Sequence, residues 1–164
     1  MEKVKEVFST LLENSIGEKI ESIESLPKEG SDRNYYRIIT IKGNKYVGTY
    51  NINVKENLSF IYFSNFFSQK NLKVPTVFAV DSTNQYYIQS DLGNLSLLDK
   101  LKQEGFTEKS KNLYKKALMA LSDLQIKGDE GLNYSNCFSG QTFDSGAIMA
   151  DLLYFKYYFL RTLK

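Results

Sequence analysis

The segment Gly30-Ser31-Asp32-Arg33-Asn34 has the residue types of a loop that binds an anion. Small, turn-forming residues let several backbone N–H groups point at one phosphate, and Ser31 and Arg33 add side-chain donors. The segment matches neither of the glycine-rich signatures G-x-G-x-x-G and G-x-x-x-x-G-K-[ST], and an ordinary surface turn uses the same residue types. Taken alone, it leaves a phosphate loop and a plain turn both open.

Two further groups of polar residues stand where an element begins or ends. Gln89-Ser90-Asp91 closes a predicted strand, and Gly93 follows, so this point is either a hinge between two lobes or a loop that caps the next helix. Glu56 stands near the start of a predicted helix. Its carboxylate either favours the helix dipole there or forms an ion pair with a cation that anchors a phosphate.

The composition excludes several classes of chemistry. The chain has 164 residues and no histidine, which excludes a serine–histidine or cysteine–histidine nucleophile and a histidine-ligated metal. Its single cysteine, Cys137, excludes an intrachain disulfide, so we expect a cytoplasmic protein. A net charge of +2 with interspersed signs argues against nucleic acid or an anionic membrane as a partner, and no apolar run is long enough to span a bilayer.

Hydrophobic periodicity predicts strands in the first half of the chain. An amphipathic helix over 4–17 comes first, and an aromatic helix over 55–70 separates two hairpins. The pair Gly43-Asn44 is expected to form the two-residue turn of the first hairpin. The expected strands cover 19–25, 34–41, 46–50, 77–80 and 86–89.

After Gly93 the pattern is helical only, and strands followed by helices indicate an α+β fold. We expect a first lobe over residues 1–92 and the start of a helical lobe over 93–164. The expected helices cover 96–104, opened by a capping box of Ser96 and Asp99, then 107–126, and then 144 to the end. The expected inner face of the second of these helices consists of Leu113, Ala117, Ala120, Leu121 and Leu124.

The run from Leu152 to Leu160 is apolar on nearly every side of a helix. Each large apolar side chain contributes about 1.5–3 kcal/mol when fully buried, so such a helix needs neighbours on most sides. We therefore expect it to belong to the core of a larger lobe whose remainder is missing, which would make the chain truncated. The alternatives are a small helical subdomain, or a homodimer that covers the helix.

Six segments, in order along the chain, match the motifs of one family: 30–38, 47–51, 56–60, Val74-Pro75, Asp91-Leu92-Gly93 and 151–158. They resemble the aminoglycoside phosphotransferase and choline kinase-like enzymes. The most similar branch is the bacterial sugar phosphotransferases, some of which act on amino sugars. The resemblance covers nearly the whole chain.

This resemblance implies a protein-kinase-like amino-terminal lobe, with a twisted antiparallel sheet and one crossing helix, followed by the first helices of the helical lobe. ATP would lie between the two, with the Gly30 turn over its phosphates and the backbone at Gln89 to Asp91 along the adenine. Glu56 would be the acidic residue of the crossing helix. The implied nucleotide-binding residues are Gly30, Ser31, Asp32, Arg33, Asn34, Glu56, Gln89, Ser90 and Asp91.

The chain departs from the family pattern at two points. The family's kinase-like lobes carry a lysine on the third strand that grips phosphates, whereas the expected strand 46–50 has none, so Arg33 or Arg37 would have to substitute or the grip differs. The catalytic aspartate of the family lies in a histidine-containing loop, with a metal-binding aspartate further on. This chain ends before both, so no catalytic residue is assigned and the Mg²⁺ site is expected in the missing part.

We therefore expect the nucleotide-binding portion of an ATP-dependent sugar or amino-alcohol kinase, whose parent protein phosphorylates a hydroxyl of a small molecule. By itself the chain is expected to be inactive. The alternative is a non-catalytic kinase-like binding or interaction module, which the missing strand lysine favours. Association of two copies through the terminal helix is a further expectation.

Overall fold

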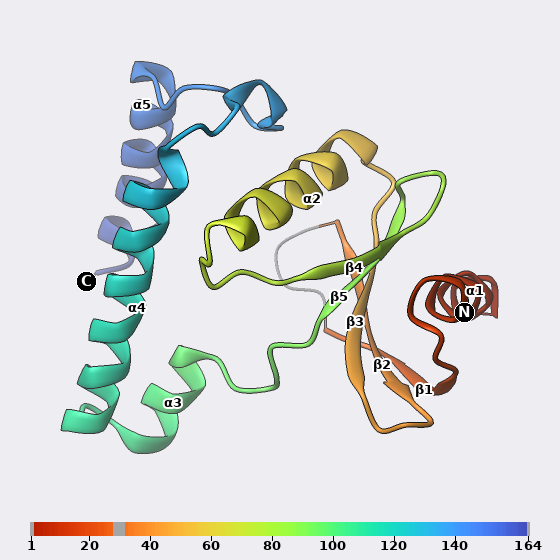
Figure 1. Ribbon diagram of the computed structural model, residues 1–164. Helices are drawn as coiled ribbons and strands as arrows, with labels where there is room; N and C mark the ends of the chain where they lie inside the picture. The colour runs from red at the N-terminus through yellow and green to blue at the C-terminus, as the bar shows by residue number, and fades with distance from the viewer. Residues whose placement is uncertain (1, 28–31, 164) are drawn as a thin grey trace. The chain divides into compact units, whose positions relative to one another are not determined.

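The computed structural model describes residues 2–27 and 32–163 (Figure 1). Contacts between residues divide the chain into two units, Met1–Leu132 and Asn133–Lys164. The expected division at residue 92, between a nucleotide-binding lobe and a helical lobe, stays a prediction.

Five strands form one antiparallel sheet in the order β1-β2-β3-β5-β4. Each expected strand is present, with its ends moved by at most one residue, and the α+β class is confirmed. The strands are β1 (Ile20–Ser25), β2 (Asn34–Thr40), β3 (Lys45–Tyr50), β4 (Val77–Val80) and β5 (Tyr86–Ser90). In the central register, Thr49 of β3 lies opposite Tyr35 of β2 on one side and Tyr87 of β5 on the other.

The turn of the first hairpin differs from the expected Gly43-Asn44 pair. The Thr40 N–H donates to the Asn44 carbonyl at 3.0 Å, so a three-residue loop, Ile41 to Gly43, joins the strands. Gly43 has φ of 82° and supplies the left-handed position that such a loop needs. Asn44 stays in an ordinary conformation because its amide donates to Glu18 at 2.8 Å and its N–H to the Thr40 hydroxyl at 3.2 Å.

One face of the sheet is apolar and packs against α1 (Glu2–Ile16), which contacts chiefly β4 and β5 (Figure 1). Phe8 and Leu12 of α1 are fully buried, and Phe8 meets Tyr36 and Tyr86 with ring centroids 5.7 and 5.6 Å apart. Gly48 makes room for this ring. A Cβ atom at that position would lie 2.7 Å from the Phe8 ring.

The helix α2 (Val54–Gln69) lies over the opposite face, where the Phe60 ring stacks on Tyr87 at 5.3 Å. Successive residues of a strand point to opposite faces, so Tyr86 serves the α1 side and Tyr87 the α2 side. Asn53 caps α2 by accepting a hydrogen bond from the Glu56 N–H. The two helices therefore sandwich the sheet, and α2 carries Glu56 to its second face.

Two capped helices follow the sheet. Ser96 and Asp99 form the expected capping box of α3 (Leu97–Glu104), and Thr107 opens α4 (Glu108–Asp129). The second helix runs three residues past its expected end. Gly128 allows this because it is buried against Phe67 of α2, where a Cβ atom would lie 3.0 Å from the ring.

The expected inner face of α4 is largely exposed. Leu113 and Leu124 are half-buried, whereas Ala117, Ala120 and Leu121 are exposed. Within its unit, α4 packs against α3 and against α2, and these contacts do not cover the stripe that runs through Ala117 and Leu121. The sequence pattern therefore located an apolar face but not what contacts it.

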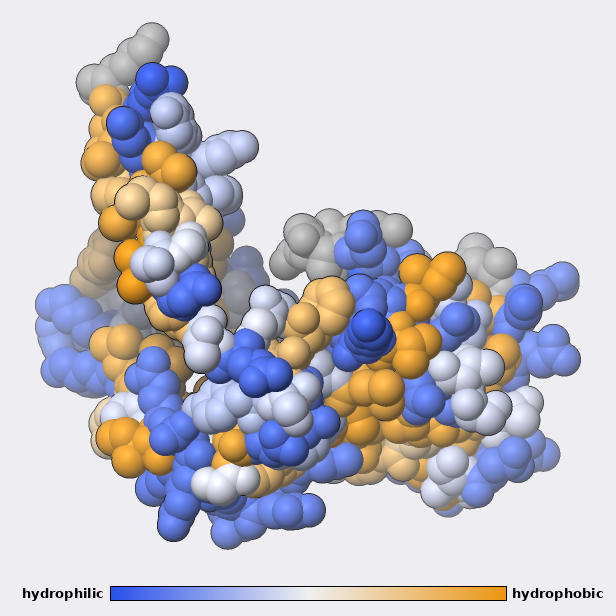
Figure 2. Space-filling model, turned by 90° about the horizontal axis from the view of Figure 1, so that it is seen from above, coloured by the Kyte–Doolittle hydropathy of each residue, from blue (hydrophilic) through white to orange (hydrophobic). Residues whose placement is uncertain are grey.

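The second unit contains a short 3-10 turn (Tyr134–Asn136) and α5 (Ser145–Tyr154), which Asp144 caps as expected. One turn of π-helix (Phe155–Phe159) and one of 3-10 helix (Leu160–Thr162) continue it. Its large apolar side chains are between 43% and 69% exposed. On the face of the molecule drawn in Figure 2, hydrophobic residues, in orange, form part of the surface.

Candidate functional site

The sheet face under α2 is polar where the opposite face is apolar. Residues that pair across neighbouring strands share a face, which gives two rows of side chains. One row runs Tyr35, Thr49, Tyr87, and the other runs Arg37, Val47, Gln89. An interior surface with this many donors and acceptors costs free energy unless each is paired, so it is a candidate for ligand binding rather than for stability alone.

Three polar atoms of this face are buried without a hydrogen-bond partner among the described residues: the hydroxyls of Thr49 and Tyr87 and the amide oxygen of Gln89. The two hydroxyls face each other, but no hydrogen bond of normal geometry joins them. Burial raises the pKa of the Tyr87 hydroxyl to about 12, and the nearby Arg33 charge only partly opposes this. Buried orphan polar atoms are uncommon in folded proteins and are typical of functional sites.

Arg33 and Glu56 form an ion pair beside these atoms. The Arg33 Nη2 atom lies 3.0 Å from Glu56 Oε1, and its guanidinium lies over the Phe60 ring at 5.4 Å. Burial acts to lower the pKa of Arg33, but the hydrogen bond with Tyr35 and the negative charge of Glu56 raise it above its ordinary value. The guanidinium is therefore a fixed positive charge at the edge of the polar face.

An asparagine network fixes the Glu56 carboxylate. The Asn51 amide donates to Glu56 Oε2 at 2.9 Å, while its oxygen accepts from the Asn53 N–H at 3.0 Å. Asn57 is fully buried and ties the Asn51 carbonyl to that of Asn84 through its own amide group, at 3.0 and 2.8 Å. Both carboxylate oxygens thus have partners, and the position of Arg33 is set by residues of three different segments.

A second ion pair organises the end of β5. Arg37 Nε lies 2.7 Å from Asp91 Oδ2, and its Nη2 atom donates to Asp91 Oδ1 at 3.2 Å and to the Gly93 carbonyl at 3.3 Å. Burial acts to raise the pKa of Asp91, but the hydrogen bonds from Arg37 and the Gly93 N–H outweigh it and leave the pKa below its ordinary value. Arg37 is thus committed to this segment, and Arg33 is the arginine that pairs with Glu56.

A cleft of about 820 Å³ lies against this segment, lined by β2, by the loop after β5 and by α3. Its walls include Tyr35 and Arg37 from the polar face and the apolar side chains of Leu26, Leu92 and Leu98. Small-molecule sites commonly have volumes of about 300–1,000 Å³, with mostly apolar walls and a few polar groups. Tyr35 connects the cleft to Arg33, because it lines the first and hydrogen-bonds to the second.

The structure brings some predicted site residues together and leaves others apart. Arg33 and Glu56 are in contact, Gln89 lies on the polar face, and Asp91 pairs with Arg37, which lines the cleft. Ser90 is used in the sheet, where its hydroxyl accepts from the Thr76 N–H at 3.0 Å. Asp32 is exposed, Asn34 begins β2, and Gly30 and Ser31 lie outside the described residues.

Sequence reasoning missed five contributors: Tyr35, Thr49, Asn51, Asn57 and Tyr87. The available signal was weak, because Thr49 and Gln89 are polar positions of this face but Val47 lies between them and interrupts any polar alternation. It also missed that β3 begins with a lysine, Lys45. This residue lies at the Asp91 end of the strand, whereas Glu56 contacts Asn51, just past the opposite end.

The described residues place a paired arginine near a cleft, and they include no cluster of metal-ligating side chains. An aromatic-backed guanidinium beside a cleft of this size suits a phosphate-bearing ligand. Within residues 2–27 and 32–163, no group of three or more acidic or cysteine side chains is placed to bind a metal ion. Glu56, Asp91 and Asp99 are each engaged with a partner of their own.

No protein-family model matches the chain, and no curated protein matches it. The resemblance to phosphotransferases thus rests on the motifs of the sequence. In the part of the chain that the structure describes, no helix has both the length and the apolar character needed to cross a membrane.

Proposed function

We propose that this chain is the nucleotide-binding part of an ATP-dependent phosphotransferase that acts on a hydroxyl of a small molecule such as a sugar or an amino alcohol. The observation that carries the proposal is the Arg33–Glu56 ion pair, which joins the segment before β2 to α2 on the polar face of the sheet. In kinases an ion pair between a sheet cation and an acidic residue of the crossing helix positions the nucleotide phosphates. Here Arg33 would take the part of the lysine.

The strand order and the single helix between β3 and β4 support a protein-kinase-like lobe, because they give the arrangement that the sequence motifs imply. Adenine would lie in the cleft between Tyr35, Leu92 and Leu98, along the backbone that follows Gln89. The phosphates would extend toward Arg33. Glu56 would hold the guanidinium in place, so that binding requires no reorganisation of the cation.

Titration calorimetry with ATP, with and without Mg²⁺, tests this proposal. The chain should bind ATP, and Arg33→Gln should weaken binding about tenfold or more, because it removes a charge-assisted contact worth about 1.5–3 kcal/mol. Arg161→Gln removes an exposed arginine of the second unit and serves as the matched control. Equal affinity of the Arg33→Gln variant and the control would contradict the proposed role.

The second candidate is a non-catalytic kinase-like binding module. It is favoured by Thr49, a small neutral residue that lies on the polar face near the Asn51 end of β3, where a lysine that could hold phosphates is missing. On this interpretation the half-buried Arg33–Glu56 pair would stabilise the fold without binding phosphates. Absence of ATP binding together with a lower free energy of unfolding in Arg33→Gln would support this second candidate.

A further inference from the structure

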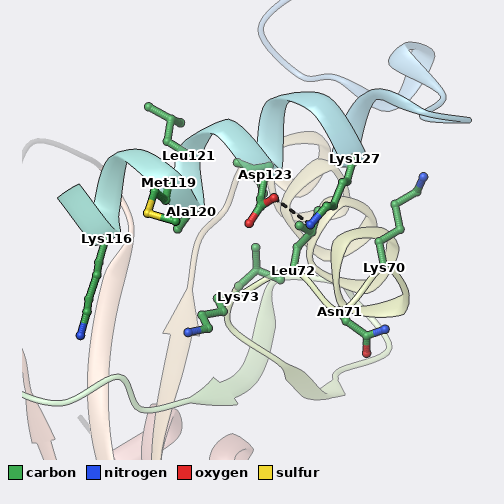
Figure 3. Close-up of a pocket in the computed structure, with 12 residues that line it drawn as sticks. Lys70, Asn71, Leu72, Lys73, Lys116, Met119, Ala120, Leu121, Asp123 and Lys127 are labelled. Atoms are coloured by element: carbon green, nitrogen blue, oxygen red, sulfur yellow. Dashed lines mark ion pairs between the residues drawn. The ribbon is translucent and has the colours of Figure 1, made fainter. Parts of the chain in front are cut away.

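A groove of about 650 Å³ lies between α4 and the segment that follows α2, residues Lys70 to Val74 (Figure 3). Neither wall belongs to the cleft beside Asp91, because the two hollows share no lining residue. Gly128 fixes one end of the groove, since its missing side chain lets α4 approach Phe67 of α2. The separation of the two walls is thus set by packing outside the groove itself.

The groove combines an apolar surface with positive charge. Leu72, Val74 and Leu124 are half-buried in it, and Met119 adds a polarizable side chain that is 69% exposed. Four lysines line it against one aspartate: Lys70, Lys73, Lys116 and Lys127 against Asp123. A pocket of this composition suits a molecule with a carbon body and an anionic end.

Two of the four lysines are committed to other partners. Lys127 Nζ lies 2.7 Å from Asp123 Oδ1. Lys70 contacts the Glu130 carbonyl, lies over the Phe66 ring and points away from the groove in Figure 3. The charge of Lys127 is therefore balanced by Asp123, and the ammonium group of Lys70 is directed away from the groove.

Lys73 and Lys116 are different. Among the residues that the structure describes, no ion pair or hydrogen bond engages either ammonium group. Figure 3 shows the Lys116 side chain extending from α4, and the Lys73 side chain pointing from the other wall toward the same side of the groove. Both ammonium groups line the groove without a counter-charge of their own, so an anion bound there is attracted by both.

We infer that this groove binds a small phosphomonoester with a carbon body. Its phosphate lies between Lys73 and Lys116, and its carbon body lies on Leu72 and Met119. A phosphomonoester carries about −1.5 to −2 charges at neutral pH, which matches two ammonium groups. Lysine binds phosphate as a point charge, so the absence of a planar guanidinium is no obstacle. The volume is within the range of about 300–1,000 Å³ that is common for small-molecule sites.

Calorimetric titration with 1-naphthyl phosphate tests the inference, with 1-naphthol and inorganic phosphate as the two partial ligands. The complete ligand should bind about tenfold or more tightly than either part, since it uses both the charge and the apolar surface. The double variant Lys73→Gln/Lys116→Gln should weaken its binding about tenfold. Equal binding of 1-naphthol would show a purely apolar surface and overturn the inference.

The matched control is Lys42→Gln/Lys115→Gln, which removes two exposed lysines outside the groove. It should leave the affinity for 1-naphthyl phosphate unchanged. An equal loss in this control would indicate nonspecific attraction by net charge. A loss with Arg33→Gln alone would place the ligand in the cleft beside Asp91, and either result overturns the inference.

A second measurement needs no variant. Pyridoxal 5′-phosphate is an aromatic phosphomonoester whose aldehyde condenses with a lysine amine, releasing water, and borohydride then reduces the imine to a stable secondary amine. Peptide mapping should find the label on lysines of the groove, chiefly Lys73 or Lys116, and 1-naphthyl phosphate should suppress it. Labelling spread evenly over lysines such as Lys42 and Lys115 would contradict the inference.

Discussion

The Arg33 guanidinium lies 3.0 Å from the Glu56 carboxylate, although Arg33 immediately precedes β2 and Glu56 lies in the first turn of α2. Their side chains are only 15% and 29% exposed. Asn51 holds the second oxygen of the carboxylate, so the pair is part of a network rather than a single surface contact. A half-buried network of this kind fixes a charge in space, which a binding site for phosphate requires.

A double-mutant cycle should show that the two residues are coupled. Arg33→Gln and Glu56→Gln should each lower the free energy of unfolding, and the double variant should lose less than the sum, with a coupling energy of about 1 kcal/mol. Urea denaturation of the four proteins measures it. The exposed pair Lys111 and Glu108, at 2.7 Å, provides the comparison and should give only a few tenths of a kcal/mol. Equal coupling in both pairs would contradict the network.

The Arg37–Asp91 pair should make stability depend on pH in the acid range. The pKa of Asp91 is lowered in the folded protein, so its contribution is complete above the ordinary carboxyl pKa, about 3.9, and is lost as pH falls through the folded value. At pH 7, Asp91→Asn should lower the free energy of unfolding by about 2 kcal/mol, because it leaves the largely buried Arg37 with only the exposed Glu24, at 3.9 Å, as a counter-charge. Below about pH 4 the difference should shrink.

Urea denaturation across pH measures this difference, with Asp123→Asn as the control. Asp123 also forms an ion pair at 2.7 Å, with Lys127, but its side chain is 53% exposed. Its loss should change the free energy of unfolding by only a few tenths of a kcal/mol at any pH. A gap between wild type and Asp91→Asn that stays constant from neutral to acid pH would exclude titration of Asp91 as its source.

The sequence predicted the elements well because each is encoded locally. Apolar spacing marked α1 and α2, and the Ser96–Asp99 capping box marked the start of α3. The site was less predictable, because its contacts join residues distant in the chain. Nothing local assigns Arg37 to Asp91 and Arg33 to Glu56, and both arginines were candidates to replace a strand lysine.

Side chains that lie far apart in sequence also explain the errors in the second half of the chain. The apolar stripe on α4 was recognised, but its burial depends on which element contacts it, and periodicity carries no information on that. The extension of α4 to Asp129 depends on Gly128 and Phe67 meeting, which likewise is a tertiary contact. Helix propensity alone disfavours glycine there.

Gly48→Ala should destabilise the first unit strongly. A Cβ atom there would lie 2.7 Å from the Phe8 ring and 2.9 Å from Ile38, so the new methyl group overpacks a filled core. We expect a loss of about 2–3 kcal/mol in the free energy of unfolding, measured by urea denaturation. Phe8→Leu should itself be destabilising, but in the double variant the smaller side chain should recover part of the loss from Gly48→Ala. Strictly additive losses would contradict a direct clash.

Tyr87→Phe should leave the protein as stable as wild type or more so, with a gain of up to about 1 kcal/mol. The Tyr87 hydroxyl is fully buried, and no described residue gives it a hydrogen bond of normal geometry, so its removal ends a desolvation cost and leaves the ring stacked on Phe60. Thr49→Val, which removes the facing hydroxyl at nearly constant shape, should behave alike. Urea denaturation measures both variants.

The same two variants separate stability from binding. If the orphan hydroxyls belong to the nucleotide site, Tyr87→Phe and Thr49→Val should keep or raise the free energy of unfolding and weaken ATP binding in calorimetry. Tyr86→Phe is the matched control, because this neighbour points to the α1 side, where its ring meets Phe8. Weaker folding in Tyr87→Phe than in the control would mean that the hydroxyl has a partner, and would remove it from the candidate site.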